Sequence, residues 1–452
     1  MHDQGIQVLL GTVKKLLRRG ATTNLAKVLG KIHPADIAHL ISYLDAKDQH
    51  TLFNLITDKE RAADALSEME WNLGAQLLVQ LDIDTVISIL HEMADDDSVE
   101  LIRNLPDELA DAILAAMKNE QSEELEQLLG YEEETAGGIM STDVFSLDQS
   151  LTVRQSIEAL QEATDVEMVF YVYVTDDHNH LVGVLSLRQL LTVPPSTLLS
   201  DIMTTDVMRV RTDTDQEVVA EMVAKYNILA IPVVDGKGKL MGLITVDDVI
   251  DVMRQEATED IFKMAGANEE ELMYGNQSFK IARSRLPWLL STLVGGVVTG
   301  SLMWYFRMTL EQVVALITFI PVITGMGGNV GGQTSTIVVR GFATGRIDFS
   351  IIKQVFFKEM RVGLIMGTVC GLVIASIAMI WHHNIYLGLV VGIAMAVAIS
   401  VAACMGVLAT SFFKRIGVDP AIASSPFVQT VNDITGILIY FSTATVFLTQ
   451  LG

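Results

Sequence analysis

A carboxylate, Asp433, stands within a stretch that is otherwise apolar, TVNDITGILIYF at residues 430–441. A charge at membrane depth costs several kcal/mol, so such a residue normally faces a protein-lined cavity, water or a partner. One interpretation is a helix N-cap, since residues 434–451 nearly suffice to span a bilayer. The uncharged residues 426–431 favour another interpretation, in which Asp433 lies about two turns inside a membrane helix. A path for a hydrated cation needs such a group.

The stretch PVITGMGGNVGGQTSTIVV, residues 321–339, holds a proline and five glycines that weaken a helix. Non-helical backbone at membrane depth is tolerated only where protein or water satisfies its polar groups. We therefore expect this stretch to line a wetted path for ions. The alternative is a tight helix crossing in which Asn329 and Gln333 form interhelical hydrogen bonds. No lysine follows the glycines, which excludes a nucleotide-binding P-loop.

The charge of the chain is divided unevenly. The 452 residues include 31 Lys and Arg and 55 Asp and Glu, for a net charge of −24. Residues 280–452 hold 11 basic and 5 acidic residues, which leaves 20 basic and 50 acidic residues, a net charge of −30, for residues 1–279. So acidic a surface repels nucleic acid and attracts divalent cations, and we expect no nucleic-acid partner. Cys370 and Cys404, both in apolar segments, predict neither a disulfide framework nor a thiolate metal cluster.

Uncharged stretches in the basic part are each long enough to cross a bilayer core about 30 Å thick. Basic residues gather before the first stretch, between the second and third, and before the fifth. The positive-inside rule then predicts five helices in the lipid bilayer, with the N-terminus inside and the C-terminus outside. The chain does not begin like a signal peptide, so we expect residues 1–279 to be cytoplasmic in a multi-pass protein of the cell membrane. The stretches are 286–306, 312–339, 362–381, 384–413 and, apart from Asp433, 420–452.

Pairs of glycines four residues apart occur in these stretches, at positions 296 and 300, 367 and 371, and 388 and 392. Membrane helices associate by close approach of their backbones, so the pairs predict helix packing.

The acidic half divides into a helical part and a repeat. Residues 1–135 carry apolar residues at helical spacing, as in DIAHLISYL, which predicts short helices stacked as a superhelical domain. Within residues 136–253, MSTDV at 140 recurs as MTTDV at 203, and LVGVLSLRQLL at 181 recurs as LMGLITVDDVI at 240. Each copy predicts an extended start, a helix, two short strands and a closing helix. The repeat resembles a tandem pair of CBS domains.

The expected fold is therefore multidomain. A cytosolic, all-α superhelical N domain is followed by an α/β tandem CBS pair, and residues 254–279 predict an acidic connecting helix. A five-helix α transmembrane domain then occupies residues 280–452.

The whole chain resembles the MgtE family of magnesium channels. The resemblance covers nearly all 452 residues and rests on motifs in preserved order, among them YEEETAGGIM, EATEDI, GGNVGGQ, FFKEMRVG and GVDPAIASSPFVQTVNDITG. It implies a homodimer with an N domain, a CBS pair, a connecting "plug" helix and five membrane helices in each subunit. It also implies Mg²⁺ permeation that cytosolic Mg²⁺ closes.

By this resemblance Asp433 falls on the family's pore aspartate, so two subunits would present two carboxylates to one ion. Mg²⁺ dehydrates reluctantly, and a filter does best to bind it through its waters. Backbone carbonyls near Gly325 and Gly328, with Asn329 alongside, are expected to accept hydrogen bonds from those waters.

The resemblance also implies carboxylates that bind regulatory Mg²⁺. Facing carboxylates repel one another when no ion is bound, and divalent ions bridge them, so rising Mg²⁺ favours a compact, closed assembly. The N-domain match is the weaker one, and Asp64 stands where relatives can have Glu. The residues are Asp64, Asp96 and Glu100 in the N domain, Asp248 and Asp251 at the end of the second CBS copy, and Glu256, Glu259 and Asp260 in the plug helix.

CBS pairs often bind adenosine nucleotides, with an acidic residue after the last strand holding the ribose. The first copy has Gln189 at that position, and Arg188 is available for phosphate. Asp248 keeps the ribose role open in the second copy, beside its assignment to Mg²⁺. ATP at the CBS pair, through Arg188, is therefore an expectation.

Two other classes compete with a channel. One is a secondary transporter that exchanges a divalent cation against Na⁺ or protons, which a single intramembrane carboxylate disfavours. The other is a membrane-anchored Mg²⁺ sensor without transport. An enzyme is not expected, because His382 and His383 lie in a predicted outer loop and no catalytic triad or metal-hydrolase spacing occurs.

Overall fold

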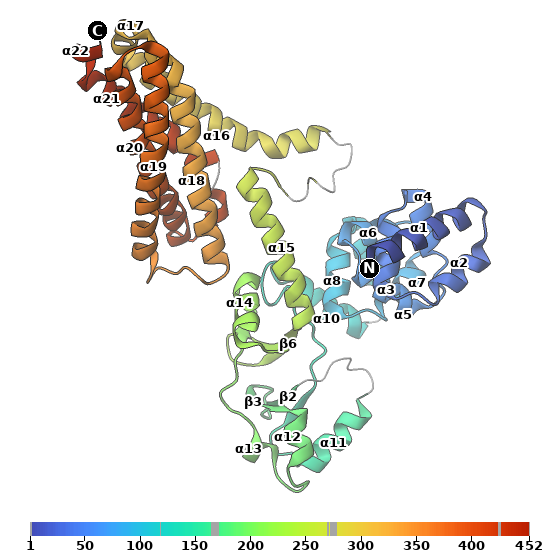
Figure 1. Cartoon of the computed structure of the whole chain (residues 1–452). Helices are drawn as coiled ribbons and strands as arrows, with labels where there is room; N and C mark the ends of the chain where they lie inside the picture. The colour runs from blue at the N-terminus through green and yellow to red at the C-terminus, as the bar shows by residue number, and fades with distance from the viewer. Residues whose placement is uncertain are drawn as a thin grey trace. The chain divides into compact units, whose positions relative to one another are not determined.

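A computed structural model describes residues 2–117, 119–163, 171–268, 271, 278–423 and 426–451 (Figure 1). The chain divides into two compact units, Met1–Met253 and Arg254–Gly452. Each unit has its own packed interior of buried apolar side chains.

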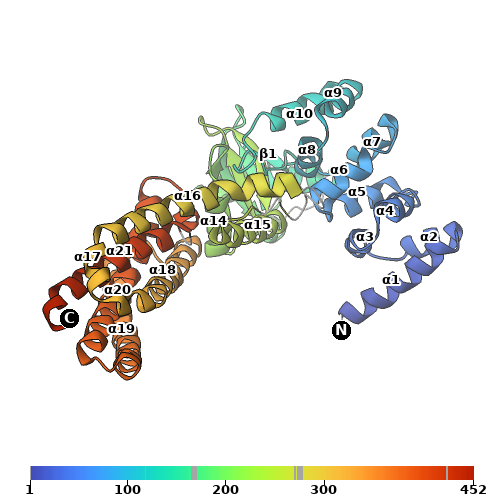
Figure 2. The same cartoon turned by 90° about the horizontal axis from the view of Figure 1, so that it is seen from above.

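The first part of unit Met1–Met253 is a stack of short helices (Figures 1 and 2). Side-chain caps define several of their starts: Asp45 accepts the N–H of Asp48, and Asp82 accepts that of Thr85 at 2.9 Å. The predicted helical N domain is confirmed. Its helices are α1 His2–Arg18, α2 Thr22–Leu29, α3 Pro34–Ser42, α4 Ala46–Phe53, α5 Lys59–Ser67, α6 Trp71–Leu78, α7 Ile83–Leu90, α8 Asp95–Arg103, α9 Asp107–Ala116 and α10 Asn119–Leu129.

The predicted repeat forms two three-stranded sheets with the same topology. In each copy the first strand pairs in parallel with the second, and the second pairs antiparallel with the third. The first copy contains β1 Ser146–Asp148, α11 Val153–Glu162, β2 Tyr171–Thr175, β3 Leu181–Ser186 and α12 Leu187–Thr192. The linking helix α13 is Leu199–Ile202, and the second copy contains β4 Val210–Arg211, α14 Gln216–Tyr226, β5 Ala230–Val234, β6 Leu240–Thr245 and α15 Val246–Ala265.

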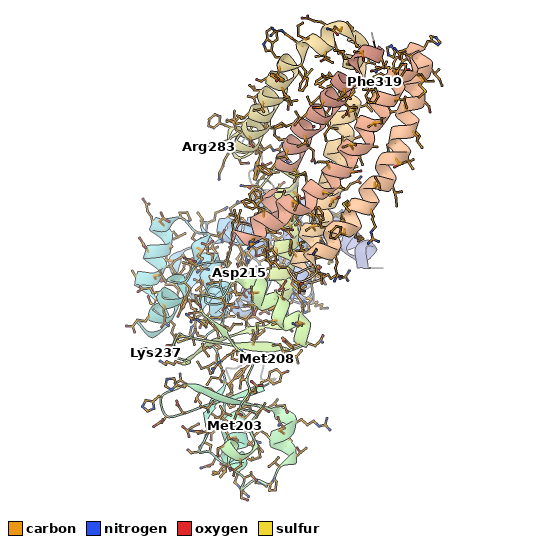
Figure 3. All side chains as sticks on the ribbon, turned by 90° about the vertical axis from the view of Figure 1, so that its left-hand side faces the viewer. Met203, Met208, Asp215, Lys237, Arg283 and Phe319 are labelled. Atoms are coloured by element: carbon orange, nitrogen blue, oxygen red, sulfur yellow. The ribbon has the colours of Figure 1, made fainter. Side chains whose placement is uncertain are left out.

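The two copies are interlocked through the repeated segments. Ser141 of MSTDV pairs with Leu243 in β6, and Thr204 of MTTDV pairs with Val184 in β3. A Cβ on Gly183 would collide with Met203, which Figure 3 labels. The glycine of each final strand therefore makes room for a methionine of the neighbouring copy.

A continuous apolar core joins the N-terminal helices to the second CBS copy, and it includes Leu66, Leu101, Ile231 and Val249. Arg103 contributes to this junction, because its guanidinium donates to the carbonyl of Gly138 at 3.4 Å. The first copy has a separate core. The carboxylates at the start of α8 are therefore held firmly relative to α15.

Helix α15 is continuous from the closing segment of the second CBS copy into the acidic segment that was expected to connect to the membrane. It ends before Gly266, whose φ of +70° belongs to the left-handed region that favours glycine at helix C-termini. Residues 269, 270 and 272–277 of the expected connecting helix lie outside the described residues.

Unit Arg254–Gly452 contains a bundle of long apolar helices (Figure 1). Among the described residues, the segments Ser278–Tyr305, Val314–Ala343, Ile352–His382 and Ile385–Arg415 are long and apolar enough to cross a membrane. Phe319 lies at the end of the bundle where α17 and the chain's C-terminus also lie (Figures 1 and 3). The elements are α16 Ser278–Tyr305, α17 Arg307–Gln312, η2 Val314–Phe319, α18 Ile320–Ala343, α19 Ile352–His382, α20 Ile385–Arg415, η3 Pro420–Ala423, α21 Pro426–Val446 and α22 Leu448–Leu451.

The glycine-rich stretch is helical throughout, although its proline and glycines predicted a weakened helix. Residues 321–339 lie inside α18, which is unbroken from Ile320 to Ala343. Pro321 is tolerated because it occupies the first turn, where its missing N–H has no intrahelical partner to lose. A continuous helix satisfies its own backbone groups in an apolar medium.

Glycines permit close crossings in this bundle. A Cβ on Gly367 would lie 2.6 Å from the carbonyl oxygen of Ala396, and one on Gly371 would lie 2.6 Å from that of Gly392. Helix packing is therefore confirmed for two of the predicted pairs. For Gly296 and Gly300 an added Cβ would meet nothing within 4 Å, so this pair forms no close crossing among the described residues of one chain.

Candidate ion pathway and regulatory carboxylates

Asp433 is the eighth residue of α21, which begins at Pro426. The interior position that the upstream residues favoured is therefore confirmed, and the N-cap interpretation was wrong. The side chain is half-buried, and no hydrogen bond or ion pair to it occurs among the described residues. Asp433 is thus a carboxylate inside a long helix without a protein partner among the described residues.

The glycines of α18 place this helix directly against α21. Asn432 is buried, and its Nδ2 donates to the carbonyl of Gly327 at 3.3 Å. A Cβ on Gly331 would collide with Asn432. A Cβ on Gly328 would lie 3.1 Å from Cγ of Gln429, so Gly328 sits against α21. This is the tight crossing that the sequence left as the alternative, although Asn432 rather than Asn329 makes the interhelical hydrogen bond.

The opposite face of α18 is polar and uncovered. The side chains of Asn329, Gln333, Thr336 and Arg340 are exposed, and their spacing of four, three and four residues places them along one stripe. Gly325 also faces open space, since an added Cβ would meet nothing within 4 Å. Polar groups on a membrane helix face water or another protein surface rather than lipid.

Glu359 is a second buried carboxylate in this unit, and it was missed. It lies in α19 with 4% of its surface exposed, and its Oε2 accepts from the hydroxyl of Thr334 at 3.5 Å. Lys358 approaches its other oxygen at 3.3 Å. Two further buried hydroxyls, Ser335 and Thr410, lie 2.9 Å apart between α18 and α20. The expectation of a single carboxylate among these helices was therefore wrong.

The basic residues around Glu359 explain the error. The motif FFKEMRVG is typical of a charged segment at the end of a membrane helix. Lys358 is indeed largely exposed. Only the packing of α19 against α18 and α20 turns the neighbouring Glu359 inward. A glutamate between two basic residues and apolar ones is a weak signal for such burial.

In the other unit, carboxylates from two helix starts come together. Helix α8 begins with Asp95, Asp96 and Asp97, and the first turn of α15 holds Asp247 and Asp248. The positive end of a helix macrodipole favours such residues. The hydroxyl of Thr142 donates to Asp95. Oδ1 of Asp96 is buried and has no hydrogen-bond partner among the described residues.

Electrostatics in this cluster favour a cation. Burial, followed by the charges of Asp248 and Asp97, raises the pKa of Asp96 well above its ordinary value. Burial likewise raises the pKa of Asp97 to about 6 and that of Asp248 to about 6. Asp251 adds to the repulsion on both. A divalent cation fits here, because it would satisfy the unpartnered oxygen of Asp96 and offset the repulsion between the carboxylates.

The other two predicted N-domain residues are not among the main charges that raise the pKa values of Asp96, Asp97 and Asp248. Asp64 is exposed on α5. Glu100 pairs with Arg103 at 3.5 Å and accepts from Asn104 at 3.4 Å, and burial raises its pKa although Arg103 opposes the rise. Asp97 was missed, although the run of three aspartates was a signal for it.

An open groove of about 620 Å³ lies beside Glu100, and the motif YEEET lines part of it. Arg103 lies among five carboxylates at its wall, of which Asp215 is labelled in Figure 3. The other lining residues are Leu129, Tyr131, Glu132, Glu133, Glu134, Thr135 and Asp213.

The acidic residues of the second half of α15 are organised by a lysine. Lys263 Nζ lies 2.6 Å from Glu259 and 2.7 Å from Asp419, which precedes η3. Burial, then the charge of Asp419, raises the pKa of Asp260. Glu256 lies one turn before Asp260 on the same helix and is half-buried. This end of α15 is therefore anchored to the loop between α20 and α21.

The residues considered for a nucleotide serve first as helix caps. Gln189 forms a capping box with Ser186 at the start of α12, and Asp248 accepts from the N–H and the hydroxyl of Thr245 at the start of α15. Arg188 lies in the first turn of α12, and its carbonyl accepts from Thr192. The equivalent positions of the two copies thus cap the equivalent helix of each copy, α12 in the first and α15 in the second.

Family models match most of the chain. Residues 32–134 match the MgtE intracellular N domain, residues 136–196 and 199–255 match CBS domains, and residues 320–443 match a divalent cation transporter family. Crystal structures agree for the first unit. The "cytosolic domain of the Mg2+ channel MgtE in complex with ATP" aligns with a TM-score of 0.51 at 35% identity, over 54% of this chain and 99% of that one. The "soluble part of a magnesium transporter" aligns with a TM-score of 0.50 at 33% identity, over 56% and 99%.

Whole-chain relatives are transporters rather than enzymes. The magnesium transporter MgtE of Thermus thermophilus is 36% identical over 96% of this chain and 97% of its own length. That of Bacillus subtilis is 33% identical over 96% of each, and that of Enterococcus faecalis is 40% identical over 73% of each. An inosine-5'-monophosphate dehydrogenase matches only 25% of this chain. On these identities and on the family models along its length, the chain belongs to the MgtE family of magnesium transporters.

Proposed function

We propose that the chain forms a homodimeric Mg²⁺ channel of the cell membrane that cytosolic Mg²⁺ closes. The observation that carries the proposal is Asp433, a carboxylate two turns inside α21 with no partner in the part of the chain that the structure describes. A single negative charge in a water-filled pore attracts a cation, and two copies would face one ion with two charges.

The uncovered stripe on α18 supports a dimer with a wetted interface. Asn329 and Gln333 need water or a second protein surface, and a pore lined by this stripe would supply both. Carbonyls near Gly325 can accept hydrogen bonds from water, because no side chain covers that position. Gly328 would act differently: it brings α21, and with it Asp433, close to α18.

Such a pore suits a hydrated ion. Mg²⁺ holds its waters in a near-ideal octahedron, so carboxylate and amide groups that bind those waters avoid the cost of dehydration. Ca²⁺ exchanges its waters for protein oxygens more readily, so a site that binds the ion through its waters favours Mg²⁺.

Helix α21 would be the fifth membrane crossing. Its 21 residues extend about 31 Å at 1.5 Å per residue, which matches a core of about 30 Å. Its polar residues, including Gln429 and Asp433, make it less apolar than the other four. With five crossings the acidic N-terminal unit lies in the cytoplasm and the C-terminus outside.

Regulation would act through the carboxylates of the soluble unit and of α15. An ion between Asp96 and Asp248 would hold α8 against α15, and the repulsion between them would loosen that contact when Mg²⁺ is scarce. Helix α15 continues to Glu259 and Asp260, beside Asp419. Movement at the start of this helix would therefore be passed to its membrane-linked end.

ATP binding at the CBS pair is part of this proposal. The similar cytosolic domain that was crystallised with ATP supports it, and Arg188 would provide the phosphate contact.

The test is electrical recording of the purified chain in planar bilayers under a Mg²⁺ gradient. We expect current without a coupled ion, and its loss in Asp433→Asn, which keeps the size of the side chain and removes the charge. Glu311→Gln, which neutralises an exposed glutamate of α17, is the control and should conduct normally. Normal Mg²⁺ current through a folded Asp433→Asn protein would refute the proposal.

Glu359 favours a second candidate, a transporter that couples Mg²⁺ to Na⁺ or protons, because a buried carboxylate can bind a coupling ion. In that case Glu359→Gln would abolish transport that depends on a proton or Na⁺ gradient. In a channel the same variant would leave the reversal potential at the value that the Mg²⁺ gradient sets.

A further inference from the structure

The turn between β2 and β3 brings two aspartates and two histidines together in the sequence DDHNH, residues 176–180. One oxygen or nitrogen atom from each of Asp176, Asp177 and His178 lies within 4.8 Å of the others. His180 joins them, since its Nδ1 lies 3.0 Å from Oδ2 of Asp176. None of these four residues takes part in the pathway or the carboxylate cluster described above.

Each histidine is oriented by its own carboxylate. Nδ1 of His178 lies 2.7 Å from Oδ1 of Asp177, and Nδ1 of His180 faces Asp176. A carboxylate fixes the proton on the nitrogen that faces it, which leaves Nε2 of each ring with a free lone pair. The rings are stacked, with centroids 6.1 Å apart and an angle of 27° between their planes. Histidine ligands of metal ions are commonly held by carboxylates in this manner.

The second CBS copy contains the same turn, which reveals what the turn itself requires. Oδ1 of Asp176 accepts the N–H groups of His178 and His180 at 2.9 and 2.8 Å. Oδ1 of Asp235 accepts those of Lys237 and Lys239 at 2.8 and 2.9 Å. The fourth residue is left-handed in both turns, with φ of 63° at Asn179 and 89° at Gly238. An aspartate at the first position and a left-handed residue at the fourth thus suffice for this turn.

The remaining positions differ between the copies. Gly236, Lys237 and Lys239 stand where the first copy has Asp177, His178 and His180. Lys237 is labelled in Figure 3. The two turns are neighbours, because His180 pairs with Lys239 across the copies. The additional carboxylate and both imidazoles of the first turn are therefore not required for the backbone conformation of the turn.

We propose that this turn binds a transition-metal dication such as Zn²⁺, Ni²⁺ or Co²⁺. Nε2 of His178 and of His180 would be the protein ligands, with water completing the coordination. Asp177 would orient His178, and Asp176 would hold the turn and orient His180. Imidazole nitrogen suits these ions, whereas Mg²⁺ prefers oxygen alone. Joint rotation of the exposed side chains of His178 and Asp177 would bring Nε2 of His178 and Nε2 of His180 to one ion. The site would differ in metal preference from the all-carboxylate cluster at Asp96 and Asp248.

The test is calorimetric titration of Zn²⁺ into the full chain in detergent, with Mg²⁺ in excess to occupy oxygen sites. The control is the double variant His178→Lys and His180→Lys, which gives the first turn the lysines of its sister and keeps the backbone geometry both turns share. We expect one Zn²⁺ site per chain that the double variant loses, with binding at least roughly 100-fold weaker. Asp177→Gly should weaken Zn²⁺ binding about tenfold, as loss of an orienting carboxylate does. Co²⁺ absorption would report nitrogen ligands in the wild-type chain alone.

Equal Zn²⁺ binding by the wild-type chain and the double variant would overturn the proposal, because the ion would then occupy other histidines or carboxylates. Absence of Zn²⁺ binding to the wild-type chain would overturn it as well. Mg²⁺-dependent protection of α8 should be the same in both proteins, which establishes that the variant is folded.

Discussion

Removing the charge of Asp248 should make the soluble unit more stable when no divalent ion is present. Its carboxyl lies between Thr245 and the aspartates of α8, and burial, with the charges of Asp247 and Asp251, raises its pKa from 3.8 to about 6. The stabilisation of the folded state by protonated Asp248 is therefore complete below pH 3.8, and it is lost as the pH rises through about 6. At pH 7.5 the charged carboxylate opposes the contact between α8 and α15.

The size of the effect follows from that rise. A rise of about two pH units corresponds to about 3 kcal/mol of disfavour for the charged form. Asp97 shares the repulsion and retains its own charge, so one substitution relieves only part of it, and we expect about 1–2 kcal/mol. That free energy lowers the population of locally open states roughly 5- to 30-fold. Asparagine still accepts a hydrogen bond at the start of α15, so the cap is kept.

Hydrogen exchange followed by mass spectrometry measures this on the full chain in detergent. With chelator at pH 7.5, peptides from α8 and the first turns of α15 should exchange more slowly in Asp248→Asn than in wild type. Mg²⁺ should slow exchange strongly in wild type and weakly in the variant, because a ligand is lost. At pH 5 the two metal-free proteins should be similar, since wild-type Asp248 is then largely protonated. Asp206→Asn, at an exposed carboxylate, is the control. Unchanged or faster exchange in metal-free Asp248→Asn would refute the reasoning.

Further predictions concern packing, topology and gating. Gly331→Ala should separate α18 from α21 and destabilise the membrane unit by about 1–3 kcal/mol, because its Cβ would collide with Asn432. The temperature of thermal aggregation in detergent should therefore fall for Gly331→Ala. It should stay unchanged for Gly332→Ala, whose Cβ would meet nothing within 4 Å. A cysteine added after residue 452 in a cysteine-free chain should react with an impermeant reagent from outside only, and labelling from the cytoplasm alone would contradict five crossings. Mg²⁺ should protect residues 254–275 from protease more than monovalent salt of equal ionic strength does, whereas equal cleavage with and without Mg²⁺ would argue against a role for the acidic residues in gating.

Local sequence pattern was sufficient to predict most helices and strands of both units. Helical spacing of apolar residues predicted the N-terminal stack, and the repeated segments predicted two copies with one topology, because these signals depend on neighbours in sequence. The same holds for Asp433, whose uncharged upstream residues placed it inside a helix. Strong hydropathy likewise located the four long membrane helices.

Local sequence pattern was misleading for α18, because glycine both weakens a helix and permits close contact between helices. Five glycines and a proline indicated a weakened helix in this stretch, yet α18 is continuous. Helix propensities are measured in water, where exposed backbone groups are solvated. In an apolar environment a broken helix would leave polar groups unsatisfied, and glycine instead permits the close approach of α21.

The sequence by itself determined the class of the protein: an acidic soluble half with a CBS repeat, long apolar helices, and a carboxylate among them. Only the tertiary structure decided which polar groups meet. It joined Asp97 to Asp248 across 151 residues of chain, and it turned Glu359 inward against Thr334. The physical reason is that burial and charge repulsion depend on distances in space. Sequence spacing fixes those distances within one helix but not between helices that are far apart in the chain.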